Sequence, residues 1–223
     1  MRHFLATFLA CSLLIAPSVC AETLSLQFLP DKDVTGQPLP SLKDTVVAIL
    51  LANREKANEA QSIGEELAFT YRGQRRFVVI SVVDVSMAPS FMQDNIRQLV
   101  LEKIRVSEIA LRERFKNAKQ TYDPPPGSVV VDWSGEMTKT VLAASERPEY
   151  ALLSKSPRSL SKDARTVLLR KQLELRNHAQ LFVINPNDNS ARQFVDLSEL
   201  SLMKTYLNQL LGKKVALSTA QEK

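Results

Sequence analysis

Short apolar runs alternate along the chain with longer segments of helical periodicity. Residues 46–51 read VVAILL, a run too short to span a membrane and too uniformly apolar for a half-exposed strand, so we expect a strand buried on both faces. Apolar residues at helical spacing follow over 56–71, and Gly73 ends that helix. Residues 77–85 are the most β-branched run of the chain. A strand, a helix and a strand with short connections predict a right-handed βαβ unit with parallel pairing.

The rest of the chain follows the same alternation. In chain order, the predicted elements are an edge strand at 22–29, a long helix at 91–117, a strand at 128–133, a helix or short strand at 136–144, a basic amphipathic helix at 160–177, strands at 180–185 and 191–195 joined by a Pro-Asn-Asp-Asn turn, and a last helix at 199–211 capped by Ser198. The stripe expected to be buried in the long helix consists of Ile96, Val100, Ile104, Leu111 and Phe115.

The first 21 residues have the composition of a secretory signal peptide. Basic residues precede an apolar run from Phe4 to about Ala16, and small residues lead to a cleavage site after Ala21. The run is shorter than the roughly 20 residues that a membrane span needs. Lipidation of Cys20 is an alternative. We therefore expect a bacterial envelope protein that is released into the periplasm and has no transmembrane segment after signal removal.

Composition narrows the chemistry. Both cysteines, Cys11 and Cys20, lie inside the predicted signal peptide, so the mature chain has no thiol and thiol chemistry is excluded. About 200 residues suffice for a single domain, predicted at 22–212 with a flexible tail at 213–223. The formal charge of +5 becomes +4 when Arg2 is lost with the signal. Nucleic acid is not an expected partner in that compartment. This positive charge is a weak indication of an anionic ligand. The alternative is a basic surface that is only solvated.

Three stretches give the chain a family resemblance. They are residues 36–47 (GQPLPSLKDTVV), 129–136 (VVVDWSGE) and 181–188 (LFVINPND). Their order and spacing resemble the thioredoxin-like fold of the peroxiredoxin and thiol–disulfide oxidoreductase families, and in particular cysteine-free periplasmic proteins of unassigned function. The resemblance implies an α/β fold with a mixed central sheet of about five strands, helices on both faces, and an inserted helical segment at about 147–177.

The departures from that family determine the functional hypotheses. The paired cysteines of the family fall on Lys56 and Glu59, and its cis-proline falls on Ala179, beside His178. The resemblance therefore implies a scaffold without redox chemistry. The leading hypothesis is a binding or accessory protein of the cell envelope with an unknown protein partner or anionic ligand. The alternative is a cysteine-independent enzyme that uses Lys56, Glu59 and His178 in the same cleft.

The candidate site residues gather near the end of the buried strand. Asn53, Arg54 and Lys56 are candidates for an anion-binding patch at a helix N-terminus, or else ordinary first-turn residues. His178, the only histidine after signal removal, is a candidate general base or a surface residue. One histidine makes no metal site, so we predict no metal and no cofactor. Trp133 is expected in the core, under the inserted helix.

The inserted segment at 147–177 is the other candidate. Its helix carries a basic excess, and extra loops on a rigid scaffold are where function tends to be added. We predict that it covers the cleft mouth or a sheet face, with Arg165, Arg170 and Lys171 binding a partner. The alternative is an insertion that only packs.

Overall fold

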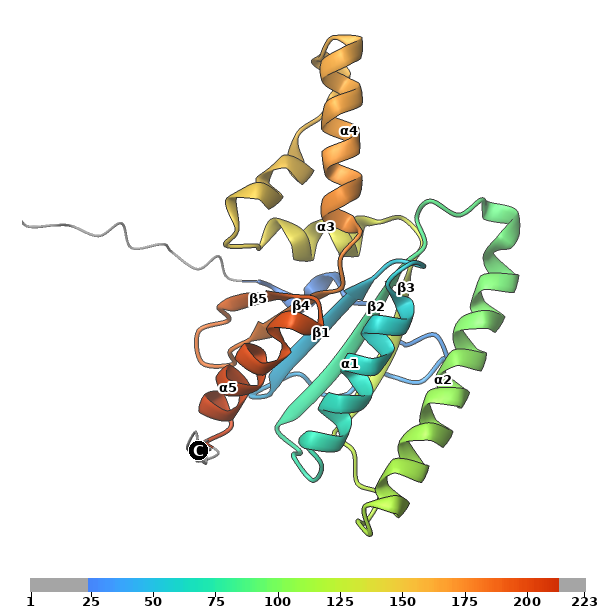
Figure 1. The fold of residues 1–223 in the computed structure, drawn as a ribbon, viewed down its shortest axis with the longest axis vertical. Helices are drawn as coiled ribbons and strands as arrows, with labels where there is room; N and C mark the ends of the chain where they lie inside the picture. Colours follow the sequence, from blue (N-terminus) through green and yellow to red (C-terminus); the bar gives the residue numbers. More distant parts are fainter. Residues whose placement is uncertain (1–23, 213–223) are drawn as a thin grey trace, which may run out of the picture.

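The structure is a computed structural model that describes residues 24–212. The predicted signal peptide and the predicted tail lie outside the described residues. Five strands form one mixed sheet (Figure 1), and their bounds are β1 Val46–Ala52, β2 Phe77–Asp84, β3 Gly127–Asp132, β4 Gln180–Ile184 and β5 Ala191–Val195. The order across the sheet is β3-β2-β1-β4-β5; β1, β2 and β3 are parallel, and β4 is antiparallel to both β1 and β5.

The described residues also form five α-helices and five short 3-10 helices. The α-helices are α1 Ala57–Thr70, α2 Gln93–Asn117, α3 Glu136–Ala143, α4 Lys162–Arg176 and α5 Leu200–Leu210; the 3-10 helices are η1 Leu26–Phe28, η2 Ser90–Met92, η3 Pro148–Ser154, η4 Pro157–Ser159 and η5 Leu197–Glu199. From β1 onwards, every predicted element is present within two residues of its predicted bounds. The predicted α/β class, with a mixed five-stranded sheet in a thioredoxin-like arrangement, is confirmed.

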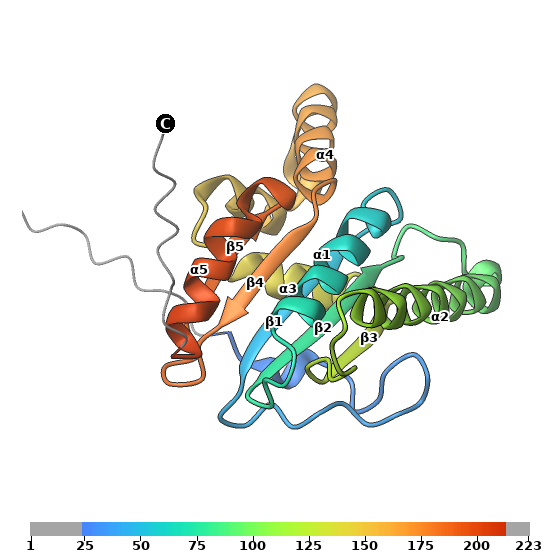
Figure 2. The same ribbon diagram turned by 60° about the horizontal axis from the view of Figure 1, so that its bottom comes forward.

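The central strand divides two apolar cores. Every residue of β1 is buried, as the sequence predicts. Because side chains alternate along a strand, Val47, Ile49 and Leu51 join a core with α3, whereas Val46, Ala48 and Leu50 join a core with α1 and α5. Helices therefore cover both faces of the sheet, and Figure 2 shows α1 and α5 together on one of them.

The sequence stretch 129–136 proves to be a strand-to-helix connection. Asp132 is fully buried, and its two carboxylate oxygens accept the backbone N–H groups of Gly135 and Thr138, each at 2.7 Å. Gly135 has φ of +76°, a left-handed conformation that glycine adopts without a steric penalty. The Asp-x-x-Gly-Glu pattern therefore starts α3 and needs no ligand to explain it.

The N-terminal strand prediction is wrong. Residues 26–28 form η1, and Leu24 is held by a hydrogen bond from its N–H to the Asn189 carbonyl. Leu26 and Phe28 both pack, half-buried, against the core on the α3 side. An alternating pattern indicates only that alternate side chains are buried. Here a tight turn buries them, and the segment is not a strand at the edge of the sheet.

The long helix packs over only part of its length. At about 1.5 Å per residue, α2 is about 38 Å long, whereas the eight residues of β2 span about 26 Å. Of the predicted stripe, Leu111 and Phe115 are buried, whereas Ile96, Val100 and Ile104 are only half-buried. The cap of the last helix was also predicted wrongly: Ser198 donates to the Val195 carbonyl and caps no backbone N–H.

Candidate functional site

Asn53, at the carboxyl end of β1, is used to begin the next helix. Its side-chain oxygen accepts the backbone N–H groups of Glu55 and Lys56, each at 3.0 Å. Its side-chain nitrogen donates to the Asn177 side-chain oxygen at 2.9 Å and to the Arg176 carbonyl at 3.3 Å. Glu55 and Lys56 precede α1, whose N-cap Lys56 has no side-chain cap, so Asn53 shapes the turn that leads into the helix without capping it. Of the predicted patch, Arg54 alone is fully exposed.

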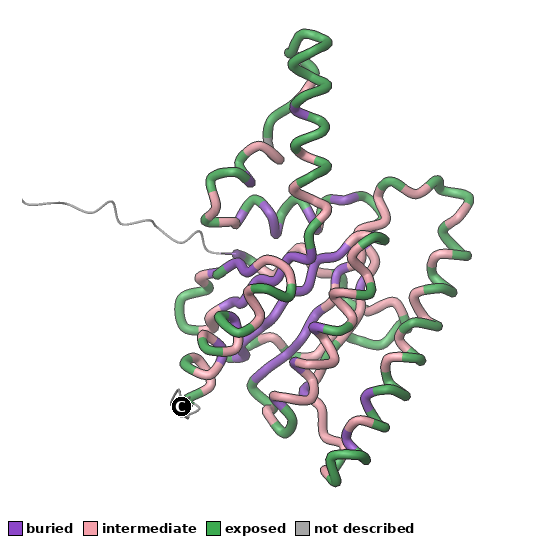
Figure 3. Tube along the Cα trace, in the orientation of Figure 1, coloured by how far each residue is buried: buried purple, intermediate pink, exposed green. Residues whose placement is uncertain are grey.

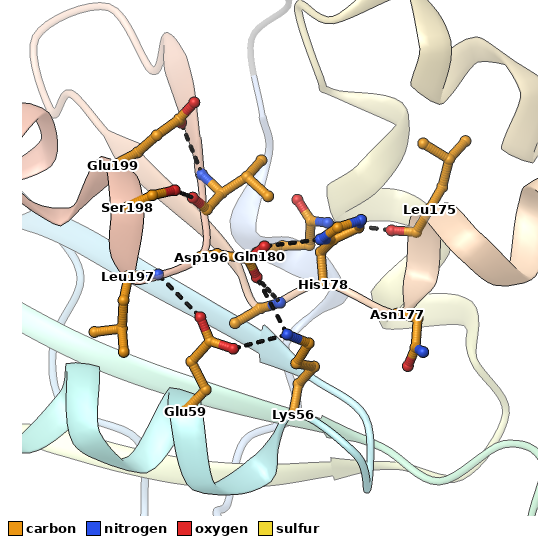
Figure 4. Close-up of polar contacts among 12 residues, drawn as sticks. Lys56, Glu59, Leu175, Asn177, His178, Gln180, Asp196, Leu197, Ser198 and Glu199 are labelled. Carbon is orange, nitrogen blue, oxygen red and sulfur yellow. Dashed lines mark hydrogen bonds and ion pairs between the residues drawn. The ribbon is translucent and has the colours of Figure 1, made fainter.

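Three of the predicted site residues converge, and a fourth residue joins them. Lys56 Nζ lies 2.9 Å from Glu59 Oε2 and 3.9 Å from Asp196 Oδ1 (Figure 4). His178 Nδ1 lies 2.8 Å from Asp196 Oδ2. Asp196 therefore joins Lys56 to His178, and we call these four residues the ion-pair network. Sequence reasoning did not identify Asp196, which follows β5 in an ordinary Val-Asp-Leu context.

The two carboxylates of the network also bind the protein's own backbone. Asp196 Oδ1 accepts the Ala179 N–H at 2.9 Å, and Glu59 Oε1 accepts the Leu197 N–H at 2.9 Å. The Asp196 N–H donates to the Ala179 carbonyl at 2.8 Å. The network thus fastens the first turn of α1 to the start of β4 and the end of β5. It occupies the place where the resemblance puts the paired cysteines and the cis-proline; the described residues contain no cis peptide bond.

Charge and space both limit what the network can do chemically. The hydrogen bond to Glu59 raises the pKa of Lys56, with Asp196 adding to the effect, so the ammonium stays protonated at neutral pH. The cavity beside the network, bordered by His178, Thr138 and Arg176, measures about 10 Å³. That volume holds about one water molecule, whereas small-molecule sites measure roughly 300–1,000 Å³.

Trp133 lies in a different place from the one predicted. It is 36% exposed and does not pack under the inserted helix. It borders a groove of about 390 Å³ at the β3 edge, which Arg97 of α2, Val34 and Lys32 also line. The Arg97 side chain donates to the Val34 carbonyl at 3.1 Å, and the Val34 N–H donates to the Val129 carbonyl at 2.9 Å. The groove is thus partly closed by the segment before β1.

The outer part of the inserted segment stands away from the sheet. Figure 1 shows α4 extending from the body of the protein. Only its C-terminal end reaches the carboxyl end of β1, through the contacts of Arg176 and Asn177 with Asn53. Of the two predicted positions, the sheet face is therefore wrong, whereas Arg176 at the end of α4 does border the cavity beside His178 at the predicted cleft. The connection between β3 and β4 is long enough for α4 to pack against η3 and η4 of the same connection instead.

A buried polar cluster attaches the inserted segment to the sheet. Gln180 Nε2, in β4, donates to the Tyr150 hydroxyl at 2.6 Å and to the Leu175 carbonyl at 3.2 Å. Gln193 Nε2 donates to Gln180 Oε1 at 2.6 Å, and Ser145 donates to Gln193 Oε1. Gln180 and Gln193 are both buried. The base of the segment is therefore fixed, whereas its outer part is exposed.

The predicted partner-binding residues differ in their surroundings. Arg165 Nε donates to the Pro157 carbonyl at 3.1 Å, so this guanidinium holds η4 against α4. Arg170 lies 3.8 Å from Glu174, and both side chains are about two-thirds exposed. Lys171 is exposed. Arg170 and Lys171 are therefore available for an external contact, and Arg165 is committed to the segment's own structure.

The described residues contain neither a metal-binding group nor a membrane-spanning helix. Residues 24–212 contain no group of three or more His, Cys, Asp and Glu side chains placed to hold a metal ion. Within the same range, no helix combines the length and the apolar character that crossing a membrane requires. Comparison with known proteins adds no assignment: no protein-family model matches the chain, and no curated protein matches it.

Proposed function

We propose that this chain is an exported thioredoxin-like protein without redox activity, and that it works by binding, as an accessory protein of the bacterial cell envelope. The export part of the proposal depends on the signal-like first 21 residues. The fold part depends on the mixed sheet and on the β-α-β and β-β-α units around it. The finer likeness to cysteine-free periplasmic members of the family belongs to the same proposal.

One observation carries the binding interpretation. At the position of the family's reactive residues, Lys56, Glu59 and Asp196 bond to one another and to backbone N–H groups. A catalytic group must have an atom free to reach a substrate, in a site of matching volume. Here each carboxylate oxygen of Glu59 and Asp196 already has a partner within the protein, and the adjoining cavity takes about one water molecule. The network replaces the redox pair with a structural fastening.

The experiment uses the chain from Glu22 to Lys223. We expect no turnover of disulfides or peroxides with an excess of reductant, because this segment contains no cysteine. Removing network side chains in Lys56→Met and His178→Gln should lower the melting temperature. A photo-cross-linking residue at position 171, compared with one at the exposed position 116 in α2, then tests binding in intact cells. Turnover, or equal adducts from both positions, would count against the proposal.

The enzyme alternative has a specific observation in its favour. The residues that it requires, Lys56, Glu59 and His178, do meet, through Asp196. The His178 side chain is also 45% exposed, so one side of its ring faces solvent. If the alternative holds, a hydrolase or transferase screen should find an activity that His178→Gln abolishes at a temperature where the variant is fully folded. Activity that survives this substitution, or no activity at all, would favour the binding proposal.

A further inference from the structure

The positive charge of the protein is concentrated in one projecting segment. We define the arm as residues 155–176, which comprise η4, α4 and the turns before them. The arm carries seven basic residues (Lys155, Arg158, Lys162, Arg165, Arg170, Lys171 and Arg176) and two acidic ones (Asp163 and Glu174). Its excess of five positive charges equals the net charge of the whole chain, in which 29 basic residues face 24 acidic ones. The rest of the chain is therefore electrically balanced.

The arm also exposes apolar side chains. Leu168 is the one buried residue of α4, and it faces the body of the arm. Leu169 is 47% exposed and Leu173 is 59% exposed, and their spacing of four residues places them on one face of the helix. By the same helical geometry, Lys162 and Arg170 flank this face. Figure 3 shows that exposed residues dominate α4 out to its tip.

This combination points to one kind of partner. A basic helix with a leucine strip and flanking Lys and Arg residues is typical of helices that lie on a bilayer surface, where the cationic heads reach the phosphates and the apolar side chains enter the headgroup boundary. A stable protein interface needs roughly 800 Å² from each partner, with a shaped groove. Two half-exposed leucines on a convex arm offer little of that, so charge must supply most of the attraction.

We propose that the arm docks this protein on an anionic lipid surface, through Lys162 and Arg170 with Leu169 and Leu173. The proposal rests on the proposed function, because it names the chemistry that a binding protein of the envelope would recognise. It does not depend on the ion-pair network. A failure of lipid binding therefore leaves the absence of redox activity untouched, and redox turnover would not alter a vesicle measurement.

The test is co-sedimentation of the chain from Glu22 to Lys223 with vesicles. We expect binding to vesicles that contain phosphatidylglycerol and none to vesicles of phosphatidylcholine alone. Each basic residue near an anionic surface strengthens binding about fivefold, so Lys162→Glu and Arg170→Glu together should weaken it by more than about 25-fold. Raising the salt from about 0.1 M to about 0.5 M should release the wild-type protein, because screening shortens the reach of the charges.

A matched control separates the arm from general charge. Lys43 and Lys116 are exposed and lie outside the arm, so their double change to Glu alters the net charge equally. We expect that control to bind phosphatidylglycerol vesicles to within about threefold of wild type, because it leaves the arm's own charges in place. The neutral changes Leu169→Gln and Leu173→Gln should weaken binding about tenfold, since Gln keeps helix propensity but removes apolar surface.

Several outcomes would overturn the proposal. One is a wild-type protein that stays in the supernatant with phosphatidylglycerol vesicles; another is a control variant that loses as much binding as the arm variant. Binding to soluble polyglutamate but not to vesicles would replace lipid by an acidic protein partner. If the arm double variant unfolds, the milder pair Lys162→Gln and Arg170→Gln decides, because both side chains are exposed and their loss leaves Gln172, which fastens the arm, in place.

Discussion

Glu66 provides the sharpest test of how much partly buried ion pairs contribute to the stability of this protein. It lies in α1 and joins three helices: its carboxylate accepts from Arg114 of α2 at 2.5 Å and from Lys204 of α5, and Thr70 donates to it at 3.1 Å. Glu66→Gln keeps the shape of the side chain and removes its charge. If the carboxylate binds its two cations as the geometry indicates, this change should loosen the packing of α2 and α5 on α1.

The magnitude follows from the pKa of this carboxyl. Desolvation is the largest single influence and raises the pKa, but the hydrogen bonds from Lys204 and Arg114 outweigh it and lower the pKa from 4.5 to about 2. A shift of that size corresponds to an upper bound of about 3 kcal/mol of folding free energy. The side chains of Glu66, Lys204 and Arg114 are 27%, 29% and 41% exposed, so solvent screens part of it. We expect Glu66→Gln to cost about 1–2 kcal/mol at neutral pH.

The dependence on pH has a definite sign. Because the folded pKa of Glu66 lies below its unfolded value, its stabilisation is fully present above pH 4.5 and is lost as the pH falls through about 2. Urea unfolding of wild type and Glu66→Gln across that range is the assay. The difference in unfolding free energy should be constant from about pH 7 to pH 5 and should then shrink toward zero in acid.

A second carboxylate provides the matched control. Glu102 pairs with Arg105 on the surface of α2, where both side chains are more than half exposed. Glu102→Gln should therefore change the unfolding midpoint much less, because solvent screens exposed pairs and their geometry costs side-chain entropy. If Glu66→Gln proves no more destabilising than Glu102→Gln, or if its cost stays the same down to about pH 2, the explanation based on three joined helices is wrong.

Three further predictions concern other parts of the chain. Asp196 has φ of +56°, which is a strained backbone conformation for a residue with a side chain. Asp196→Ala and Asp196→Gly both lose the side-chain bonds but only the Ala variant keeps the strain, so it should be less stable by about 1 kcal/mol in urea unfolding. Equal stability of the two variants would contradict this backbone strain. Tyr150→Phe leaves a buried amide N–H of Gln180 without its acceptor and should lower the free energy of unfolding by about 1–3 kcal/mol. A loss under about 0.5 kcal/mol would contradict this prediction and would indicate that a water molecule replaces the hydroxyl. Thiol titration of the exported protein should find none of the two cysteines, Cys11 and Cys20; a count of two would refute cleavage after Ala21.

Local sequence patterns determined the elements. The run 46–51 is buried on both faces of the sheet because all of its side chains are apolar and their burial is favourable whichever face they occupy. The helices and later strands lie where periodicity placed them, since the turn residues between them fix the chain's direction changes locally. The parallel pairing of β1 with β2 and the antiparallel pairing of β4 with β5 also followed, because strand-helix-strand units impose the first and a short turn imposes the second, whereas one mixed sheet was implied only by the family resemblance.

Only the tertiary structure decided which side chains meet. Asp196 joins Lys56 and His178 because the antiparallel pairing of β1 with β4, and of β4 with β5, brings the end of β5 beside the first turn of α1. Nothing in the local sequence around Asp196 records that neighbour. The direction of the arm depended likewise on a buried cluster, built from Tyr150, Gln180 and Gln193, that is spread over more than 40 residues. Periodicity reports which face of an element avoids water, but the neighbour that covers this face is set by the register of the whole sheet.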